Sequence, residues 1–355
     1  MHIHTRPLLA ACALGAVAVV ATPAGAATEL TFTTSGTPTS PASLVLEDWA
    51  DTIAERTDGE VTVEFYYQQS LSKLADNLEA VSSGLADIGI IVPAYSKQDL
   101  PLTYLSSTSY ASGDPYAVAT AWMETREAFP AIQEEEEEAG LKFLAVNSIG
   151  PTLFVGDRFY TSPEDFAGAT MRLSSHYSRA AQQFGWDVSP ARIRSPETYT
   201  ALEKGTITGS TTYANQIYPF KLNEVADHVT TLNLGQHANM IYASLDTWES
   251  LSEEHRQAIE ETLPQLTEDL AKAEIQYAEE TLGKIEADPT YPVKVMRLEG
   301  EERDAWADAL RGSYEANVEE ASAINPTAAE IAERYMAEID DAAGEVEASG
   351  YPWSQ

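Results

Sequence analysis

The alternation of strand-type and helix-type segments along almost the whole chain is the strongest constraint on its fold. Strand-type runs rich in β-branched and aromatic residues begin near residues 30, 61, 87 and 141. Segments with apolar residues at helical spacing predict helices over residues 42–56, 74–83, 114–139 with a break at Pro130, 175–184 and 196–204. This alternation is typical of an α/β protein.

The last third of the chain is predicted to be rich in helix. A helix begins near residue 252 and runs to about residue 287, with a kink or break at Pro264, because a proline inside a helix removes a backbone hydrogen bond. One more strand is predicted over residues 291–298, followed by helices over residues 301–321 and 326–343, the second ending at Gly344. No Gly/Ser-rich linker separates two halves, so a chain with two lobes is expected to cross between them more than once.

The charge of the protein excludes some classes of partner. The sequence has 56 acidic and 21 basic side chains in 355 residues, a formal net charge of −35. Such an acidic surface argues against nucleic acid and anionic membranes as partners. It also means that a bound anion would need a local cationic pocket. The glutamate run at residues 134–138 is expected on a solvated helix, because consecutive helical positions do not converge on one metal ion.

The first 26 residues have the pattern of a secretory signal peptide. A short polar start is followed by an apolar run over residues 8–20, which is too short to span a bilayer, and by a small-residue cleavage site that ends at Ala26. The expected location is therefore periplasmic or extracellular. The only cysteine, Cys12, lies in this segment, so no disulfide is expected after cleavage. A lipid anchor at Cys12 is the less favoured interpretation, because almost no apolar core precedes it.

The sequence lacks the common signatures of enzymes. It has no Gly-rich phosphate loop, no His-Glu-x-x-His motif and no Gly-x-Ser-x-Gly nucleophile elbow. The four histidines that follow the signal segment are widely separated in the sequence: His176, His228, His237 and His255. We therefore expect no catalytic residues, no cofactor and no metal site formed by the protein alone.

An arginine at the end of a short strand is the main candidate for a binding residue. Residues 161–172 read as a polar turn, a glycine and a strand that ends at Arg172, and the segment ETYTALEKGTITG follows over residues 197–209. A guanidinium stays charged, and its planar fork of donors matches a carboxylate. The alternative is a structural arginine that pairs with a buried carboxylate of the protein.

Together these two segments resemble the signature of the solute-binding proteins of TRAP (tripartite ATP-independent periplasmic) transporters. Three more motifs of that family occur in the same order, as WADTIAERTDG over residues 49–59, LEAVSSGLADI over residues 78–88 and KLNEV over residues 221–225. The resemblance thus extends over nearly the whole chain after residue 26. It implies that Arg172 holds the carboxylate of the transported acid.

The resemblance also implies a two-lobed α/β fold like that of periplasmic binding proteins, with a cleft between the lobes and a helix-rich C-terminus. The expected division is a signal peptide over residues 1–26, lobe I over residues 27–149 plus about 238–280, and lobe II over residues 150–237 plus about 281–355. The chain is expected to cross between the lobes near residues 148–151, near residues 235–240 and through the long C-terminal helix.

Departures from the family pattern bear on the ligand. Thr212 and Tyr213 stand where many members have a ligand-contacting asparagine and a proline, and Thr152 stands where members that bind hydroxylated sugar acids have a second arginine. In the first lobe, mostly apolar or weakly polar residues fall at or near ligand-facing positions. The expected ligand-binding residues are Arg172, Thr152, Thr212, Tyr213, Ser35, Val92, Pro93, Tyr95 and Arg194.

These departures favour a compact or partly apolar acid over one of the sialic-acid type. Arg192 or Arg194 would supply a second cation for a dicarboxylate if one of them points inward; otherwise both are surface residues. The predicted function is the capture of a small organic acid and its delivery to a membrane permease driven by an ion gradient. A monomer that binds no nucleic acid is expected. The alternatives are an ABC-type binding protein, a secreted enzyme acting on a small acid, or a partner of a sensor kinase. The resemblance leaves open whether a metal bridges ligand and protein.

Overall fold

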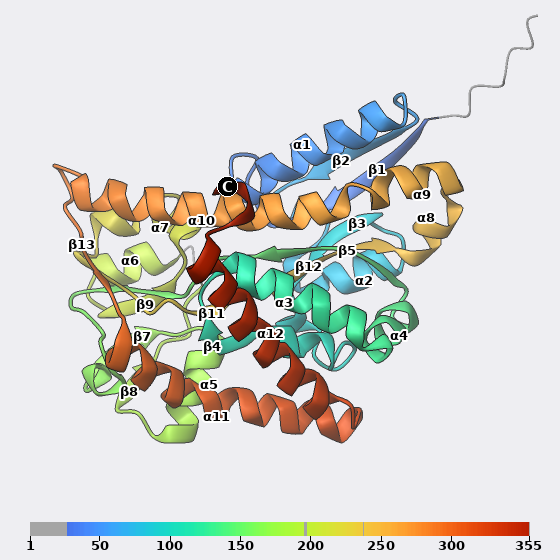
Figure 1. Cartoon of the computed structure of the whole chain (residues 1–355). Coiled ribbons are helices and arrows are strands. Elements are labelled where there is room, and N and C mark those ends of the chain that lie inside the picture. Colours follow the sequence, from blue (N-terminus) through green and yellow to red (C-terminus); the bar gives the residue numbers. More distant parts are fainter. Residues whose placement is uncertain (1–26, 195–196, 237, 355) are drawn as a thin grey trace, which may run out of the picture.

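The computed structural model describes residues 27–194, 197–236 and 238–354, and the chain forms two lobes, each built on one sheet (Figure 1). The predicted signal peptide, with Cys12, and His237 lie outside the described residues. Lobe I, at the right of Figure 1, has a five-stranded sheet in the order β2 (Val61–Tyr66), β1 (Thr28–Thr33), β3 (Ile88–Ile91), β12 (Ala238–Ser244), β5 (Leu141–Ser148). Lobe II has a six-stranded sheet in the order β13 (Lys294–Arg297), β10 (His228–Thr231), β6 (Leu153–Gly156), β9 (Gly209–Thr212), β7 (Ala169–Arg172), β8 (Val188–Pro190).

Helices cover both faces of each sheet. Lobe I carries α1 (Pro41–Arg56), α2 (Asn77–Ser82), α3 (Pro115–Ala128), α4 (Pro130–Glu138), α8 (Leu245–Ser250) and α9 (Glu253–Glu260). Lobe II carries α5 (Ser175–Phe184), α6 (Thr198–Glu203) and α7 (Ala214–Ile217). The chain closes with α10 (Leu263–Ala287), α11 (Gly300–Ile324) and α12 (Ala328–Ser349). The α/β class predicted from the alternating pattern is confirmed.

The central strand β6 is apolar on both sides because the sheet of lobe II is covered on both faces. In β6, Leu153 and Val155 belong to one core cluster, and Phe154 between them belongs to another, where it packs against Trp306 of α11. Successive side chains of a strand point to opposite faces, so an unbroken apolar run is what a two-sided core requires.

The chain passes between the lobes several times. It leaves lobe I after β5 and enters lobe II at β6, and it returns from β10 through β11 (Leu234–Gln236) to β12. β11 pairs with β4 (Thr108–Ser112). The long helix α10 packs against α1 and β5 in lobe I and against α7 and β13 in lobe II, and Figure 1 shows it lying across both. These are the three crossings expected from the sequence; α11, which contacts both α5 and α12, is a further one.

The predicted division of the chain differs from the packing at its C-terminal end. It assigns residues 281–355 to lobe II, but α12 lies beside α3 of lobe I (Figure 1). Ile331, Tyr335 and Ile339 recur every four residues on one side of α12, and all three belong to the core cluster shared with α3. This apolar side fits the lobe I face that the other helices leave uncovered. The remaining boundaries stay a prediction.

Two predicted helix boundaries, one at a proline and one at a glycine, had different outcomes. The break at Pro264 is confirmed, since α9 ends at Glu260 and Pro264 lies in the first turn of α10, where its missing N–H is tolerated. The predicted helix end at Gly344 is wrong, because α12 continues to Ser349 and ends before Gly350, whose φ is +75°. An isolated, exposed glycine weakens a helix by only about 1 kcal/mol, which flanking turns can offset.

None of the helices in the described parts of the chain is both long enough and apolar enough to cross a membrane.

Candidate functional site

A cleft of about 1030 Å³ opens between the two lobes. Its lobe I wall comes from the segment that follows β1, the end of β3, and the ends of β5 and β12 that approach lobe II. Its lobe II wall comes from the end of β7, the start of α5, residues 190–194 and the segment that follows β9. The carboxyl ends of parallel strands thus face the cleft, which is the usual place for a ligand in an α/β protein. The volume suits a small molecule.

Arg172 places a cation in this cleft. It is the last residue of β7 and lies opposite Ser210 of the parallel strand β9. Its Nη1 donates a hydrogen bond of 2.7 Å to the backbone oxygen of Thr211, which fixes the direction of the guanidinium. The side chain is half-buried, and this burial lowers the pKa of Arg172, while the phenols of Tyr213 and Tyr95 act in the opposite direction. Arg172 therefore carries a positive charge that is partly desolvated and is oriented by its hydrogen bond to the backbone.

The two phenols come from opposite walls of the cleft. Tyr213 follows β9 in lobe II, and burial raises its pKa to about 12, against the pull of Arg172. Tyr95 follows β3 in lobe I, and 60% of it is exposed. Arg172, Tyr213 and Tyr95 all line the same cleft, so polar groups of both lobes face it.

Six of the nine residues expected at the ligand site line the cleft, namely Arg172, Tyr213, Ser35, Val92, Tyr95 and Arg194. The other three, Thr152, Thr212 and Pro93, lie beside it and are buried. Thr212 donates a hydrogen bond of 3.1 Å from its Oγ1 to Oε1 of Gln216, and the N–H of Thr152 is 3.2 Å from the backbone oxygen of Leu234. Spacing in the sequence locates a residue along a strand or loop, but it does not fix which way the side chain points.

The arginines of the 190–194 segment lie at the rim. The side chain of Arg194 is 86% exposed and pairs with Glu197 at 2.6 Å. This hydrogen bond raises the pKa of Arg194 and lowers that of Glu197. Arg192 lines the cleft and is also exposed.

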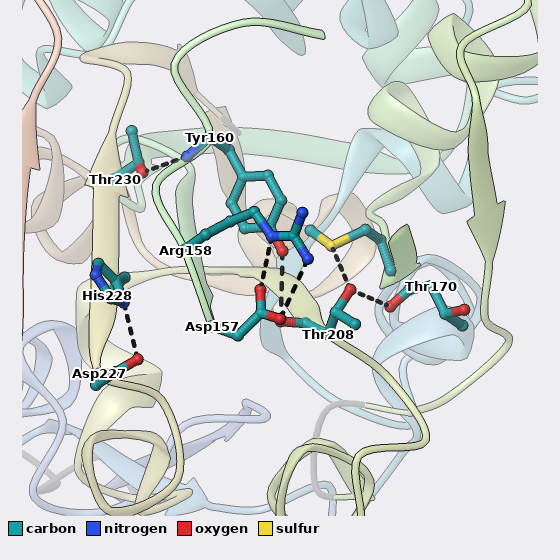
Figure 2. Close-up of polar contacts among 9 residues, drawn as sticks. Asp157, Arg158, Tyr160, Thr170, Thr208, Asp227, His228 and Thr230 are labelled. Atoms are coloured by element: carbon teal, nitrogen blue, oxygen red, sulfur yellow. Dashed lines mark hydrogen bonds and ion pairs between the residues drawn. The ribbon is translucent and has the colours of Figure 1, made fainter. Parts of the chain in front are cut away.

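Thr208 lies within lobe II and supports the sheet. Figure 2 shows its Oγ1 beside the backbone oxygen of Thr170, a hydrogen bond of 3.2 Å. Its own backbone oxygen accepts from the hydroxyl of Tyr160 at 3.3 Å. A Cβ at the neighbouring Gly209 would lie 2.6 Å from that hydroxyl and 2.8 Å from the sulfur of Met171, so only glycine fits there.

Several polar residues that line the cleft are not among the nine expected from the sequence. Asn147 of β5 and Asn239 of β12 line it from lobe I, and Asn215 and Gln216 of α7 line it from lobe II. A signal for the first two was present, because each is an amide in a largely apolar strand. Such an exception indicates either a buried hydrogen bond or a site.

A buried acid lies behind the lobe II wall. Glu274 of α10 is 4% exposed, and loss of hydration raises its pKa to about 7, while a hydrogen bond with Asn215 acts in the opposite direction. Glu274 thus connects the helix that spans both lobes to a residue that lines the cleft.

The described residues contain no group of three or more His, Cys, Asp or Glu side chains that could hold a metal ion. His176 lies on α5, His228 pairs with Asp227 (Figure 2), and His255 pairs with Glu60. None of these three lines the cleft.

Comparisons with known proteins agree with this architecture. The model of the family described as "Bacterial extracellular solute-binding protein, family 7" (DctP) matches residues 32–321. The C4-dicarboxylate-binding periplasmic protein DctP of Rhodobacter capsulatus is 26% identical over 268 residues, which cover 73% of this chain and 77% of that protein. The ectoine-binding periplasmic protein TeaA of Halomonas elongata is 25% identical over 251 residues, which cover 70% of this chain and 72% of that protein.

A solved structure confirms the two-lobed fold. A TRAP periplasmic solute-binding protein from Bordetella bronchiseptica, crystallised with bound mandelate, superposes with a TM-score of 0.74 at 21% identity and covers 88% of this chain and 99% of that one. Proteins of this family and fold bind solutes and are not enzymes, which agrees with the expectation from the sequence. The chain therefore belongs to family 7 of the bacterial extracellular solute-binding proteins, to which its resemblance to TRAP solute-binding proteins pointed.

Proposed function

We propose that this protein captures a small organic acid outside the cytoplasm and delivers it to the membrane permease of a TRAP transporter. The observation that carries the proposal is Arg172, a half-buried guanidinium that lines the cleft between the lobes. A carboxylate that pairs with it gains charge-assisted hydrogen bonds in a partly desolvated setting, where such bonds are strongest.

The remainder of the wall favours a compact or partly apolar acid. Leu74, Ile90 and Val92 line the cleft on lobe I, and Phe220 lines it on lobe II. The named ligands of the relatives, a C4-dicarboxylate, ectoine and mandelate, are all small. Apolar walls with a few fixed polar groups are what small-molecule sites generally present.

Binding is expected to close the lobes, and the closed form would be the one that a permease recognises. Arg172 and Tyr213 belong to lobe II, whereas Tyr95 and Ser35 belong to lobe I. A ligand that contacts both walls stabilises the state in which they are close together. Delivery to a permease and the periplasmic location are supported by the family relationship and remain proposals. The monomeric state is a further proposal.

A thermal-shift screen of organic acids on the purified protein tests this function. Binding to the native state raises the melting temperature by mass action, so a cognate acid is expected to shift it by several degrees. Arg172→Ala should abolish the shift, and Arg158→Ala serves as the matched control that should retain it, because Arg158 is an exposed arginine of lobe II that pairs with Asp157 and does not line the cleft. If no mono- or dicarboxylate shifts the wild-type protein, the proposed function is wrong. Incubation of the best acid with the protein, followed by chromatography, should recover the acid unchanged.

A further inference from the structure

Two amides face each other across neighbouring strands at the lobe I end of the cleft. Asn147 of β5 and Asn239 of β12 are direct partners in the antiparallel register. The partners two residues farther along the same face, Ala145 and Ile241, are buried in the apolar core of lobe I. This row of side chains is therefore apolar until it reaches the cleft, where it changes to a pair of asparagines.

The environment of these amides indicates a ligand. Asn147 is 3% exposed and Asn239 is 7% exposed, yet both line the cleft. The Oδ1 atoms of both side chains are buried and have no hydrogen-bond partner among the described residues. Buried polar groups in native proteins are nearly always paired, so two adjacent exceptions at the wall of a cleft require an explanation.

The charges of the walls determine what the ligand can carry at this end. The charged residues that line the described cleft are Arg172, Arg192 and Arg194, and all three belong to lobe II. The lobe I wall therefore offers neutral groups, and the two Oδ1 atoms are acceptors. A second carboxylate would find no cation there, whereas a hydroxyl or an amide N–H would supply the missing donor.

We propose that Asn147 and Asn239 form a second recognition point, and that the ligand is an acid with a hydroxyl or amide N–H at the end away from its carboxylate. This inference rests on the proposed function, because Arg172 is taken to hold the carboxylate. The two amides lie where β5 leaves lobe I and where β12 enters it. They would therefore contact the ligand next to the connections from β5 to β6 and from β11 to β12, which are the segments expected to bend on closure.

The test compares acids that differ only at the far end. One set is butyrate, 4-hydroxybutyrate and succinate, and a second is benzoate, 4-hydroxybenzoate and terephthalate. Calorimetry on the wild-type protein should give the lowest Kd for the hydroxy acid in at least one set, by about 10-fold or more, because a site built to bond a hydroxyl rejects an analogue that lacks it. Asn147→Leu and Asn239→Leu should each reduce this ratio of Kd values toward one and leave the affinity for the unsubstituted acid nearly unchanged.

The melting temperature of the ligand-free variants separates recognition from a structural role. Replacing a buried amide whose oxygen has no partner by a leucine of similar size should leave the melting temperature unchanged or raise it, whereas loss of a structural hydrogen bond would lower it. Asn147→Ser and Asn239→Ser provide conservative versions if leucine disturbs the fold. Acids that bind through Arg172 with no preference for the hydroxyl, or with a preference that the asparagine variants retain, would overturn this inference and leave the proposed function intact. Absence of binding by every acid would overturn the proposed function itself.

Discussion

At the scale of single residues, Arg172 determines what the cleft can bind. Its hydrogen bond to the backbone of Thr211 holds the guanidinium in place before a ligand arrives, so little side-chain entropy remains to be lost on binding. The lowered pKa of Arg172 reflects partial loss of hydration. A guanidinium is so strongly basic that Arg172 nevertheless stays charged at any physiological pH.

Arg172→Ala is expected to weaken binding of the cognate acid by about 2–5 kcal/mol, because it removes one partner of a partly desolvated charge pair. Arg172→Lys should also bind poorly, since an ammonium cannot reproduce the planar fork of donors. Isothermal calorimetry on both variants measures this. Arg158→Ala is the control, because that side chain lies outside the cleft lining and pairs with Asp157. Equal affinities of the wild type and Arg172→Ala would remove Arg172 from the site.

The sequence was informative about Arg172 and Tyr213 because motif spacing places both at strand ends, and strand ends open into the cleft. It placed Thr152, Thr212 and Pro93 in the site, but these residues are buried and do not line the cleft. The direction of a side chain at a strand end depends on twist and register between strands far apart in the chain. Asn147 and Asn239 were missed for the same reason, since they become neighbours only when β5 pairs with β12.

At the scale of elements, α10 connects the two lobes and carries a buried acid near its middle. Burial raises the pKa of Glu274 from 4.5 to about 7. In the unfolded chain this carboxyl ionises above about pH 4.5, whereas in the folded protein it keeps its proton until about pH 7. The folded state therefore binds more protons between these values, and the contribution of Glu274 to stability falls as the pH rises through this window.

Glu274→Gln, which stays neutral, should accordingly raise the free energy of unfolding at pH 8 by at most about 3 kcal/mol and change it little at pH 4.5. Urea denaturation at the two pH values measures this. A matched control is Glu280→Gln, farther along the same helix, where the carboxylate is exposed and pairs with Lys284. If Glu274→Gln lowers stability equally at both pH values, the carboxyl is a structural hydrogen-bonding group whose ionisation is irrelevant.

Local signals predicted most elements well. α1, α5, β2 and the break before α10 follow from apolar periodicity, glycine and proline, which act within a few residues. The end of α12 and its packing against α3 were not predicted, because each depends on a tertiary contact. An exposed Gly344 is a stop signal only when nothing packs along the turns on either side, and Ile339 and Ala342 are buried just before it.

At the scale of the whole molecule, the net charge of −35 makes stability depend on salt. Self-repulsion of such a surface opposes the compact state, and added salt screens it. The melting temperature should therefore rise between about 0.05 and about 0.5 M NaCl, where the screening length becomes shorter than typical separations of surface charges. Scanning calorimetry in NaCl and in KCl should show equal increases in melting temperature, because screening depends on ionic strength and not on the identity of the cation. A melting temperature that falls with salt would indicate that ion pairs such as Lys97–Glu320 outweigh the repulsion.

The arrangement of the crossings determines how the lobes can move. The connection from β5 to β6, the return into β12 and the helix α10 join the lobes side by side, without a flexible linker. Such connections permit rotation about a few residues at the ends of elements and restrain free tumbling. The cleft is lined by groups from both lobes, so a ligand that contacts both walls would favour a state in which they are close together.

Saturating acid should therefore reduce the radius of gyration slightly without changing the secondary structure. Small-angle scattering measures the first and circular dichroism the second, with the acid that gives the largest thermal shift as the ligand. Arg172→Ala in the same concentration of acid is the control and should keep the radius of the free protein, because the closed state gains nothing from a ligand that does not bind. An unchanged radius in wild-type protein that calorimetry shows to be saturated would mean that the cleft is already closed before the ligand enters. A local movement would then have to admit the ligand in place of closure, and Tyr95, exposed on the lobe I wall of the same cleft as Arg172, would be the first side chain to examine.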